Sequence, residues 1–597
     1  MKKLLTTLFI TLLPLNAYAV SESEQQSIIS DQNRLIQRDQ QFEIDKIEKK
    51  DLKQVEQNRK EFDEEEIQEF EEDDGKIVQN LRRLRCFRID KIIFSTNKIL
   101  SKKDEKNLVQ DYVGKCISLW QITKINKKIS DHLIASGYAT SRSEVPQQSL
   151  SSGILRFEII ESNLEEIIFN QEKFSDKVQK FTAFGLIKRN EVLNLRSIEQ
   201  GLEQVNRLRS NSATIKILPS KNEKSSLVAV ENNPKNRTFL SAAYDNSGNK
   251  LTGSRRETIG LSHDNLFWLN DNLTINRTAN DLDKNRKDGG GTNSTSASFS
   301  VPLSWYNLTI NYSKSSYFFW EGTSERFKSS GVTSTKSVSL DRILFKDKKI
   351  KLASNFNLTT RYRQNFINDT KVQVSSRKAS IASASLPATF FFENSSLFLK
   401  PTYSKGLNIL DSKKDDPNIA KNSVHAEFDI LKFYGNLSQK LQISEVPIAY
   451  NLSFDSQFSK QKLYSNDQFS VGGIHSVRGF KEGVISGDSG YNVKNEFSAN
   501  LGKIFAPFLS EKNSQCLTRL NHFSVAPFYD YGHIQLKAGQ GSGRLSGAGF
   551  KLGFDAKNFD ASIVFSWALS KSQFLGAQNL RENSAVFFNL SSEVGFF

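Results

Sequence analysis

The sequence predicts a mainly β protein: a transmembrane β-barrel of about sixteen strands, preceded by two small β-α-α-β-β modules and an N-terminal helix. Three observations lead to this fold class. A secretory leader opens the chain, a tandem repeat fills residues 85–237, and short strands with alternating polar and apolar residues run from 238 to 597. In an exported chain, strands with one apolar and one polar face suit a barrel with lipid outside and water inside.

The composition excludes several classes of protein. The 597 residues include 81 Lys and Arg against 66 Asp and Glu, so the formal net charge is +15. The mean hydropathy of −0.47 argues against a bundle of membrane helices, because each such helix needs about 20 consecutive apolar residues. The basic residues are scattered and the chain is exported, so we expect no nucleic-acid partner. They suit a solvated, lipid-facing or lumen-lining surface instead.

Residues 1–19 have the pattern of a secretory signal peptide. Lys2 and Lys3 precede the apolar run Leu4–Leu15, and an A-x-A cleavage pattern ends at Ala19. A buried N-terminal helix is the alternative, but the run is short and its flanks are those of a leader. Export makes disulfides possible in the mature chain.

Residues 20–84 form an N-terminal extension. Apolar residues recur at near-helical spacing over residues 23–47 on a polar background, which predicts a helix too polar to be buried in a core. The segment Glu61–Asp74 then contains ten acidic residues in fourteen, which is typical of a solvated linker. We therefore expect a detachable helix on an acidic tether.

Residues 85–162 and 163–237 repeat one order of elements. The first module is predicted to contain a strand, two helices and further strands, and the second to repeat this pattern. One face of the second helix should be apolar through Leu119, Ile122, Ile125, Ile129 and Leu133. The predicted elements are Cys86–Phe94, Asp104–Val113, Leu119–Ser136 and Ile154–Glu161 in the first module, and Leu164–Phe169, a helix through Leu195–Leu208, Ala213–Leu218 and Ser226–Glu231 in the second.

Residues 238–597 make up the predicted barrel. Apolar side chains occupy alternate positions in segments such as Tyr306–Tyr312 and Ile448–Phe454, with mostly polar residues between them. A strand of about ten residues with its turn takes roughly 22 residues, so this stretch holds about sixteen strands. A soluble sandwich or β-helix shows the same alternation. Long polar connections such as Asn280–Ser296 and the aromatic end Phe596-Phe597 favour the barrel.

The three cysteines lie in different contexts. Cys86 begins the first strand of the first module, and Cys116 lies between its two helices. A disulfide between them would close 30 residues and contribute about 3–4 kcal/mol on the chain-entropy model. Two unpaired thiols are the alternative. Cys516 is left without an assigned role.

The sequence contains no motif that argues for an enzyme. The six histidines form no H-E-x-x-H pattern and have no zinc-ligand spacing with the cysteines. Neither a phosphate-binding loop nor a G-x-S-x-G elbow is present. We therefore expect no catalytic residues, no cofactor and no metal site.

The most informative segment is Phe469–Glu496. Gly473 and Gly479 let the backbone turn sharply on either side of Arg478. A long loop of this kind is suited to folding back into a water-filled lumen, where Arg478 would need a carboxylate partner because an unpaired buried charge is costly. An ordinary exposed arginine on a flexible loop is the alternative interpretation.

These segments resemble the outer-membrane transporters of two-partner secretion, the TpsB proteins, especially the haemolysin type and the type that exports contact-dependent growth-inhibition toxins. The resemblance extends from about Gln25 to Phe597. Three blocks carry it: Cys86–Ile89 with Cys116, Gly137-Tyr138, Pro146-Gln147 and Gly153–Leu155; the long and specific segment Leu193–Leu208; and Ser476–Phe480 with Gly487–Tyr491 and Asn495-Glu496.

The resemblance implies a sixteen-stranded barrel, two periplasmic POTRA (polypeptide-transport-associated) modules and an N-terminal helix that plugs the pore. It identifies a conserved loop motif at Val477, Arg478, Gly479 and Phe480, with Asp530 on the inner barrel wall as the partner of the arginine. The Pro-free acidic linker departs from the family pattern.

The resemblance also implies a function and a place. The chain should lie in the outer membrane of a Gram-negative cell as a monomer surrounded by lipid, with its POTRA modules in the periplasm. These modules would capture the unfolded N-terminal secretion domain of one large exoprotein, which is an adhesin, a haemolysin or a growth-inhibition toxin. β-Augmentation at Ile154–Glu161 or Ala213–Leu218 is the expected mode. A general outer-membrane insertase or a passive porin is the alternative.

Overall fold

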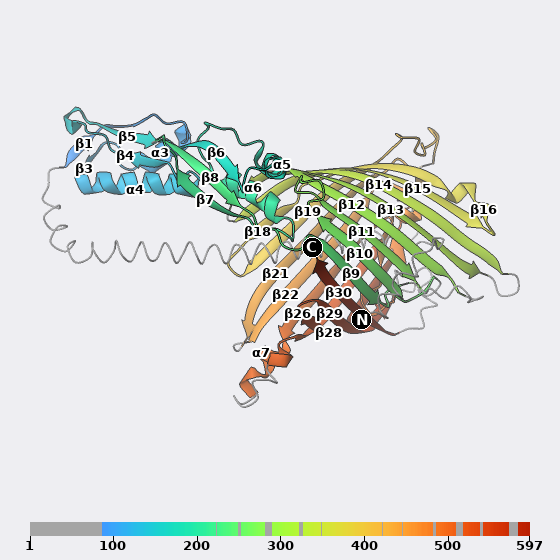
Figure 1. Ribbon diagram of the computed structural model, residues 1–597. Coiled ribbons are helices and arrows are strands. Elements are labelled where there is room, and N and C mark those ends of the chain that lie inside the picture. Colours follow the sequence, from blue (N-terminus) through green and yellow to red (C-terminus); the bar gives the residue numbers. More distant parts are fainter. Residues whose placement is uncertain are drawn as a thin grey trace. The chain divides into compact units, whose positions relative to one another are not determined.

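The computed structural model describes two units of the chain (Figure 1). The first unit is described from Cys86 to Pro234 and the second from Lys235 onward. The expected leader, the plug helix, the acidic linker and Cys516 lie outside the described residues. These residues are 86–222, 224–248, 252–280, 289–321, 326–347, 349–420, 422–443, 446–481, 485–508, 518–537, 541–571 and 583–596.

The first module packs two helices on a small sheet with the strand order β2-β5-β4, and β1 pairs separately with β3. Strands β2 and β5 are parallel. Their inward side chains and one face of α4 form a core of Ile122, Ile125, Ile129, Leu133, Leu155, Phe157 and Ile159. The elements are β1 (Phe87–Ile89), β2 (Lys91–Ser95), α3 (Lys102–Val109), β3 (Lys115–Ile117), α4 (Leu119–Ala135), β4 (Arg142–Glu144) and β5 (Ile154–Ile160).

Three details of the first module differ from the sequence prediction. The expected strand Cys86–Phe94 is two strands, because Asp90 breaks the pairing and donates its N–H to the Gly153 carbonyl over 2.8 Å. The short strand β3 between the helices was missed. Leu119 is 51% exposed rather than part of the buried face. It is the first helical residue, and side chains tilt toward the N-terminus, so Leu119 points beyond the helix end.

The second module repeats the arrangement with the strand order β6-β8-β7. Gly201 permits the close approach of its two helices, because a Cβ there would lie 2.2 Å from Cδ1 of Phe184. The elements are β6 (Asn163–Phe169), α5 (Phe174–Phe184), α6 (Leu195–Asn206), β7 (Thr214–Pro219) and β8 (Ser225–Glu231).

The second unit is a closed antiparallel barrel of sixteen strands among the described residues, in which β30 pairs with β9. Strands β17 and β18 are one barrel strand, because both pair with β15 on one side and β19 on the other. Pro387, which has no N–H to donate, lies at the break between them. A two-residue strand, β16 (Thr370–Lys371), only extends the end of β15.

The barrel strands are β9 (Thr238–Asp245), β10 (Arg256–Asp264), β11 (Asn272–Asn280), β12 (Gly291–Leu303), β13 (Tyr306–Glu321), β14 (Phe327–Lys346), β15 (Ile350–Ile367), β17 (Arg377–Ser385), β18 (Ala388–Phe391), β19 (Ser395–Leu407), β21 (Asp429–Ile443), β22 (Val446–Ser459), β26 (Ser489–Asn500), β27 (Phe523–Gln535), β28 (Ser542–Ala556), β29 (Phe559–Lys571) and β30 (Ser584–Phe596).

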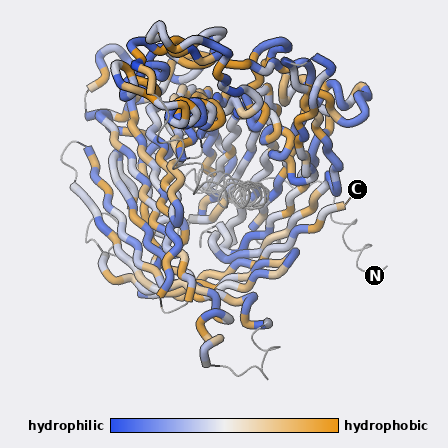
Figure 2. The backbone as a smooth tube through the Cα atoms, turned by 90° about the vertical axis from the view of Figure 1, so that its left-hand side faces the viewer, coloured by the Kyte–Doolittle hydropathy of each residue, from blue (hydrophilic) through white to orange (hydrophobic). Residues whose placement is uncertain are grey.

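The side chains of the barrel alternate as predicted. On β13, Leu308, Ile310 and Tyr312 are exposed, whereas Ser313 and Ser315 are buried on the opposite face. Figure 2 shows the same alternation of hydrophobic and hydrophilic residues along the barrel strands. An apolar outer face and a polar inner face are what a lipid-embedded barrel requires. In the part of the chain that the structure describes, no helix is both long and apolar enough to cross a membrane.

Candidate functional site

The segment between β22 and β26 folds back against the barrel wall, and we call residues 460–488 the inner loop. It contains β23 (Lys462–Leu463), a 3-10 turn (Ser465–Asp467), β24 (Phe469–Val471) and β25 (Ile485–Gly487). Strands β24 and β25 pair with each other and contact β27. On β27 the loop covers the face opposite to the exposed Tyr529. Because the apolar exposed face is the outside of the barrel, the inner loop lies in the lumen.

Arg478 of the inner loop is held by two carboxylates of the wall. Its Nε and Nη2 atoms lie 2.7 Å and 2.8 Å from the carboxylate oxygens of Asp530 on β27. Its backbone N–H donates to the same carboxylate over 3.0 Å, and its Nη1 lies 2.5 Å from Oε2 of Glu496 on β26. The side chains of Arg478 and Asp530 are 4% and 0% exposed. Such bidentate, charge-assisted contacts fix both position and orientation.

The rest of this cluster is apolar. The guanidinium carbon of Arg478 lies 3.5 Å from the ring centroid of Phe528, within the range of a cation–π contact. The neighbouring residues Val477 and Phe480 are buried in one small core with Val471, Ile485, Ile534 and Leu545. Within the motif, Arg478 binds the carboxylates, and the buried side chains of Val477 and Phe480 keep water away from this ion pair.

Glycines make room for the inner loop. Gly479 has φ +111°, and a Cβ there would lie 2.8 Å from the carbonyl of Trp567 on β29. On the wall, a Cβ at Gly532 would lie 2.8 Å from Val477, and a Cβ at Gly547 would lie 1.6 Å from the carbonyl oxygen of Arg478. The wall thus lacks side chains where the loop docks.

The structure brings together Val477, Arg478, Gly479, Phe480 and Asp530, which were predicted from the sequence. It adds Glu496, Phe528 and the wall glycines, which were not predicted as site residues. The glycines at alternate positions 547 and 549 of one strand were a signal that could have been used. Glu496 belongs to the motif block Asn495-Glu496, but its contact with Arg478 could not be read from the sequence, because it depends on how β26 pairs with β27.

A further buried carboxylate holds the two arms of the inner loop together. Asp488 is fully buried and accepts hydrogen bonds from the backbone N–H of Leu463 at 2.7 Å and of Lys537 at 2.8 Å. The side chain of Gln468 donates to it over 3.2 Å. Asp488 therefore ties the start of the loop to its end.

The segment Leu193–Leu208 lies at the junction of the two modules. The N–H of Leu195 donates to the carbonyl of Gly137 over 2.8 Å, and Nη2 of Arg196 donates to the carbonyl of Ala135 over 2.6 Å. Gly137 has φ +93°, and a Cβ there would lie 2.7 Å from Oδ1 of Asn194. The first residues of α6 thus bind the backbone carbonyls at the end of α4, and these hydrogen bonds fix the second module to the first.

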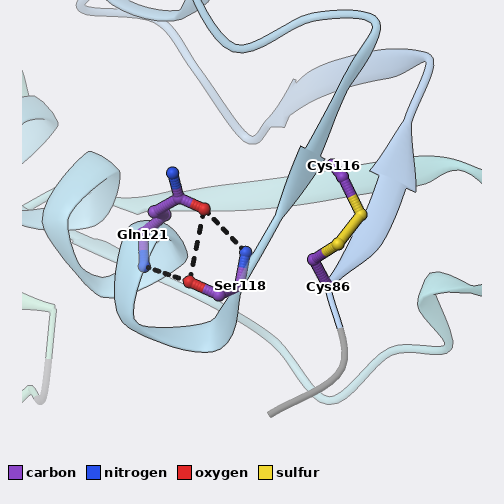
Figure 3. Close-up of a disulfide and its surroundings, with 4 residues drawn as sticks. All are labelled: Cys86, Cys116, Ser118 and Gln121. Carbon is purple, nitrogen blue, oxygen red and sulfur yellow. Dashed lines mark hydrogen bonds between the residues drawn. A yellow bond between two sulfur atoms is a disulfide. The ribbon is translucent and has the colours of Figure 1, made fainter. Parts of the chain in front are cut away.

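Cys86 and Cys116 form a disulfide with a Cα–Cα distance of 5.3 Å (Figure 3). It joins the start of β1 to β3, next to the capping box of α4. In that box the N–H of Ser118 donates to Oε1 of Gln121 over 2.8 Å. The disulfide thus fixes β1 to β3, immediately before the N-terminal cap of α4.

One expected docking edge is not available. Strand β5 (Ile154–Ile160) lies between β2 and β4, so it is not a sheet edge. Beyond the short strand β4, the side chain of Gln148 bonds both the N–H and the carbonyl of Arg156, over 2.8 Å and 2.9 Å. The expectation that Ile154–Glu161 accepts an added strand is therefore wrong. Strand β7 of the second module does lie at the edge of its sheet.

No group of three or more His, Cys, Asp and Glu residues that could hold a metal occurs among the described residues. The Arg478 cluster is the main candidate site of the barrel, and its contacts hold the inner loop to the barrel wall.

Comparison with known proteins gives three family matches. Residues 224–554 match the family of the haemolysin secretion/activation proteins ShlB/FhaC/HecB. Residues 87–162 match the ShlB-type POTRA domain, and residues 163–219 match another POTRA domain family.

Individual relatives agree with these matches. The outer membrane transporter CdiB of Dickeya dadantii is 32% identical over 69% of this chain and 72% of its own. The hemolysin transporter protein HpmB of Proteus mirabilis is 24% identical over 80% of this chain and 81% of its own. The solved structure of CdiB from Escherichia coli has a TM-score of 0.76 and 25% identity, over 86% of this chain and 91% of that one. These matches do not favour a general insertase or a passive porin.

Proposed function

Because the chain belongs to the haemolysin secretion/activation family ShlB/FhaC/HecB and is an outer-membrane translocator of two-partner secretion, we propose that Arg478 keeps the inner loop in its transport-competent position. The observation that carries this proposal is the burial of one arginine between two carboxylates in the lumen. A buried ion pair is costly to assemble, so a role in positioning accounts for it better than stability does.

The energetics support a sharp effect of losing Arg478. Removal of one partner from a buried pair costs about 3–5 kcal/mol, because the other charge is left unpaired. In Arg478→Ala the fully buried Asp530 would lose the two side-chain hydrogen bonds that it accepts from Arg478. The apolar contacts of Val477 and Phe480 would remain, but they fix the loop less specifically.

We propose that the partner is one large secreted exoprotein, bound through its unfolded N-terminal secretion domain. Strand β7 supports this mode, because it is an exposed edge strand onto which an extended segment can add by β-augmentation. The names of the relatives, which include transporters of haemolysin, point to cargo of this class.

The same proposal covers the domain boundaries, the oligomeric state and the driving force of transport. The functional segments are the leader 1–19, the plug helix and linker 20–84, the POTRA modules 85–162 and 163–237, and the barrel 238–597. The protein acts as a monomer in the lipid of the outer membrane and catalyses no reaction. Folding of the cargo outside the cell supplies the driving force, since the sequence contains no nucleotide-binding loop.

The test of the loop compares Arg478→Ala, Arg478→Lys and the control Arg544→Ala. Arg544 lies on β28 near the inner loop but is exposed. Heat-modifiable migration in gels reports barrel folding, and cargo in the medium reports secretion. We expect all three variants to fold, Arg478→Ala to secrete poorly, and Arg478→Lys to recover only partly, because lysine cannot form the bidentate contact. Normal secretion by Arg478→Ala would defeat the proposal.

The test of the edge strand uses Ile217→Lys combined with Leu218→Lys, since both side chains are exposed and edge lysines oppose strand addition. The control is Val145→Lys, an exposed apolar position of the first module outside its strands. Binding of the cargo's N-terminal domain to the full-length protein in detergent should fall only in the β7 variant. Equal binding by both variants would exclude β7 as the docking strand.

A further inference from the structure

We propose that Asp467 is a second positioning residue of the inner loop, which it fastens to a part of the wall distant from the Arg478 cluster. We call Asp467 with Arg361 and Arg377 the base latch. This inference rests on the proposed function of the inner loop, and it adds a site on the opposite arm of that loop.

The base latch is a buried ionic contact. Oδ1 of Asp467 lies 3.1 Å from Nη1 of Arg361 on β15, and Oδ2 lies 2.6 Å from Nη2 of Arg377 on β17. The three side chains are between 4% and 9% exposed. Hydrogen bonds of charged pairs at this burial are strong and directional.

Neighbouring contacts hold the same turn of the loop. Arg363 on β15 donates to the side chain of Asn466. The guanidinium carbon of Arg377 lies 3.8 Å from the ring centroid of Tyr464, and Nε2 of Gln457 donates to the carbonyl of Asp467 over 2.8 Å. The turn is therefore bound to β15, β17 and β22 by polar and cation–π contacts.

The two fastenings lie on different arcs of the barrel. In the order β17-β19-β21-β22-β26-β27, the strand of Arg377 is five steps away from the strand of Asp530. The two arginines that bind the Asp467 carboxylate thus lie on strands that pair with neither β26 nor β27, the strands that bind Arg478, although Gln457 on β22 beside β26 also binds the Asp467 carbonyl. The inner loop is consequently a tie across the lumen rather than a flap hinged at one site.

The packing at the base latch differs from that at the tip. A cavity of 170 Å³ lies beside Asp467 and is lined by Asn466 and Gln468 of the loop and by wall residues that include Arg361, Lys432, Phe428 and Ile430. The tip is instead surrounded by the apolar core of Val477 and Phe480. At the base, Leu463 of the loop also packs against Phe428 and Ile430 of the wall, and the ionic contacts of Asp467 add the directional fastening that apolar contacts do not supply.

The charges of the two fastenings are opposite. At the base latch one carboxylate binds two guanidinium groups, and among the described residues the buried Nη1 of Arg377 has no hydrogen-bond partner. At the tip one guanidinium binds two carboxylates. Removal of the central carboxylate removes the acceptor that both guanidinium groups share, whereas removal of one arginine leaves Asp467 bound to the other. Asp467→Asn should therefore be more harmful than Arg361→Gln.

The first experiment compares Asp467→Asn, Arg361→Gln, Arg478→Ala and the control Asp411→Asn in a Cys516→Ser parent. Asp411 is an aspartate of a nearby loop whose side chain is 97% exposed. The measurements are heat-modifiable migration, secretion of the cargo and ion currents in planar bilayers. We expect Asp467→Asn to fold but to secrete about tenfold less or worse, with unsteady currents. Arg361→Gln, which leaves the contact of Asp467 with Arg377, should lose less secretion than Asp467→Asn, and the control should stay near the parent.

The second experiment replaces the latch by a covalent bond. Arg363→Cys with Asn466→Cys places two thiols that a short, reducible bis-thiosulfonate cross-linker can join, because the long arginine side chain spans the gap between these positions. In the Asp467→Asn background, cross-linking should restore secretion and steady currents, and reduction of the linker should remove both. The parent with Cys516→Ser alone, treated in the same way, controls for reduction of the disulfide between Cys86 and Cys116.

The outcomes separate the two proposals. If Arg478→Ala is defective while Asp467→Asn secretes normally, the base latch is refuted and the proposed function stands. If the cross-link fails to rescue Asp467→Asn, or if it blocks secretion in the parent, Asp467 does not act by holding the loop in place. If Arg478→Ala itself secretes normally, the proposed function of the loop fails first.

Discussion

Gly547 offers a direct way to dislodge the inner loop without touching its charged residues. A Cβ at this position of β28 would lie 1.6 Å from the carbonyl oxygen of Arg478, and 2.8 Å from its carbonyl carbon. Substitution by alanine adds only one methyl group to a strand, which the barrel fold itself tolerates. The loop, however, has to move.

The size of the required shift follows from the structure. Ordinary contact begins near 3.4 Å, so the carbonyl of Arg478 must move by about 1.8 Å, given the 1.6 Å clash. The hydrogen bonds of Arg478 to Asp530 are 2.7–3.0 Å long, and a shift of this size breaks them. We therefore expect a cost of about 3–5 kcal/mol, the cost of separating a buried pair, rather than the 1–3 kcal/mol typical of overpacking.

The assay reads the position of the loop and the transport of cargo together. Ser476 is 7% exposed, so Ser476→Cys in the Cys516→Ser parent should resist a membrane-impermeant maleimide. Gly547→Ala should make this cysteine reactive and reduce secretion, while the barrel stays heat-modifiable. The control is Gly435→Ala, where the nearest atom to the new Cβ lies at 3.4 Å. Continued protection and normal secretion in Gly547→Ala would refute the reasoning.

Three other predictions concern the POTRA modules. Gly137→Ala should loosen the junction, because the φ of +93° and the 2.7 Å approach to Asn194 both exclude a Cβ; cleavage between the modules by a protease should rise. Cys116→Ser should lower the free energy of unfolding of the first module by about 3–4 kcal/mol, measured as faster proteolysis. Burial raises the pKa of Glu172, but hydrogen bonds from Lys180 and the backbone lower it more, so the pKa lies below its ordinary value of 4.5. The Glu172–Lys180 pair therefore contributes its full stabilisation at pH values above the ordinary pKa of 4.5, and this stabilisation is lost as the pH falls through the lowered pKa of Glu172. Glu172→Gln should therefore make the stability of the second module less dependent on acid pH.

Each of these predictions has a matched comparison. Gly114→Ala controls the junction variant, since φ is also positive there but no atom lies within 4 Å of the new Cβ. Equal cleavage in both variants would show that the backbone strain of a positive φ, and not the lost approach to Asn194, causes the effect. For the disulfide variant, unchanged proteolysis would mean that the core of α4 suffices. An unaltered acid dependence in Glu172→Gln would assign the acid sensitivity to other carboxylates.

The fold class followed from local patterns because the membrane imposes them. A strand between lipid and water must alternate apolar and polar residues, so positions such as Leu308 and Ile310 reveal their outward direction without any tertiary information. Helix periodicity placed Ile122–Leu133 in the first module in the same way. The prediction that Leu119 is buried was wrong, because an apolar stripe along a helix does not show where the helix ends relative to the sheet on which it packs.

The site was only partly accessible to such reasoning. The glycines around Arg478 indicated a folded-back loop, but Asp530 came from the family resemblance and not from any spacing. Glu496 was not assigned to the site, since its contact follows from the pairing of β26 with β27. The availability of β5 as an edge was misjudged, because β5 lies between β2 and β4, and beyond β4 the side chain of Gln148 occupies the place of a strand.

The sequence by itself determined the export signal, the two modules and the alternating wall, since each depends on residues close together in the chain or on composition; it predicted the pairing of Cys86 with Cys116, which the structure confirmed. Only the tertiary structure decided which wall residues meet the inner loop. Asp467 binds arginines that are 106 and 90 positions away, and such partners depend on strand register and barrel closure. Register is a property of the whole wall, because the turns and the side-chain patterns of neighbouring strands set it together.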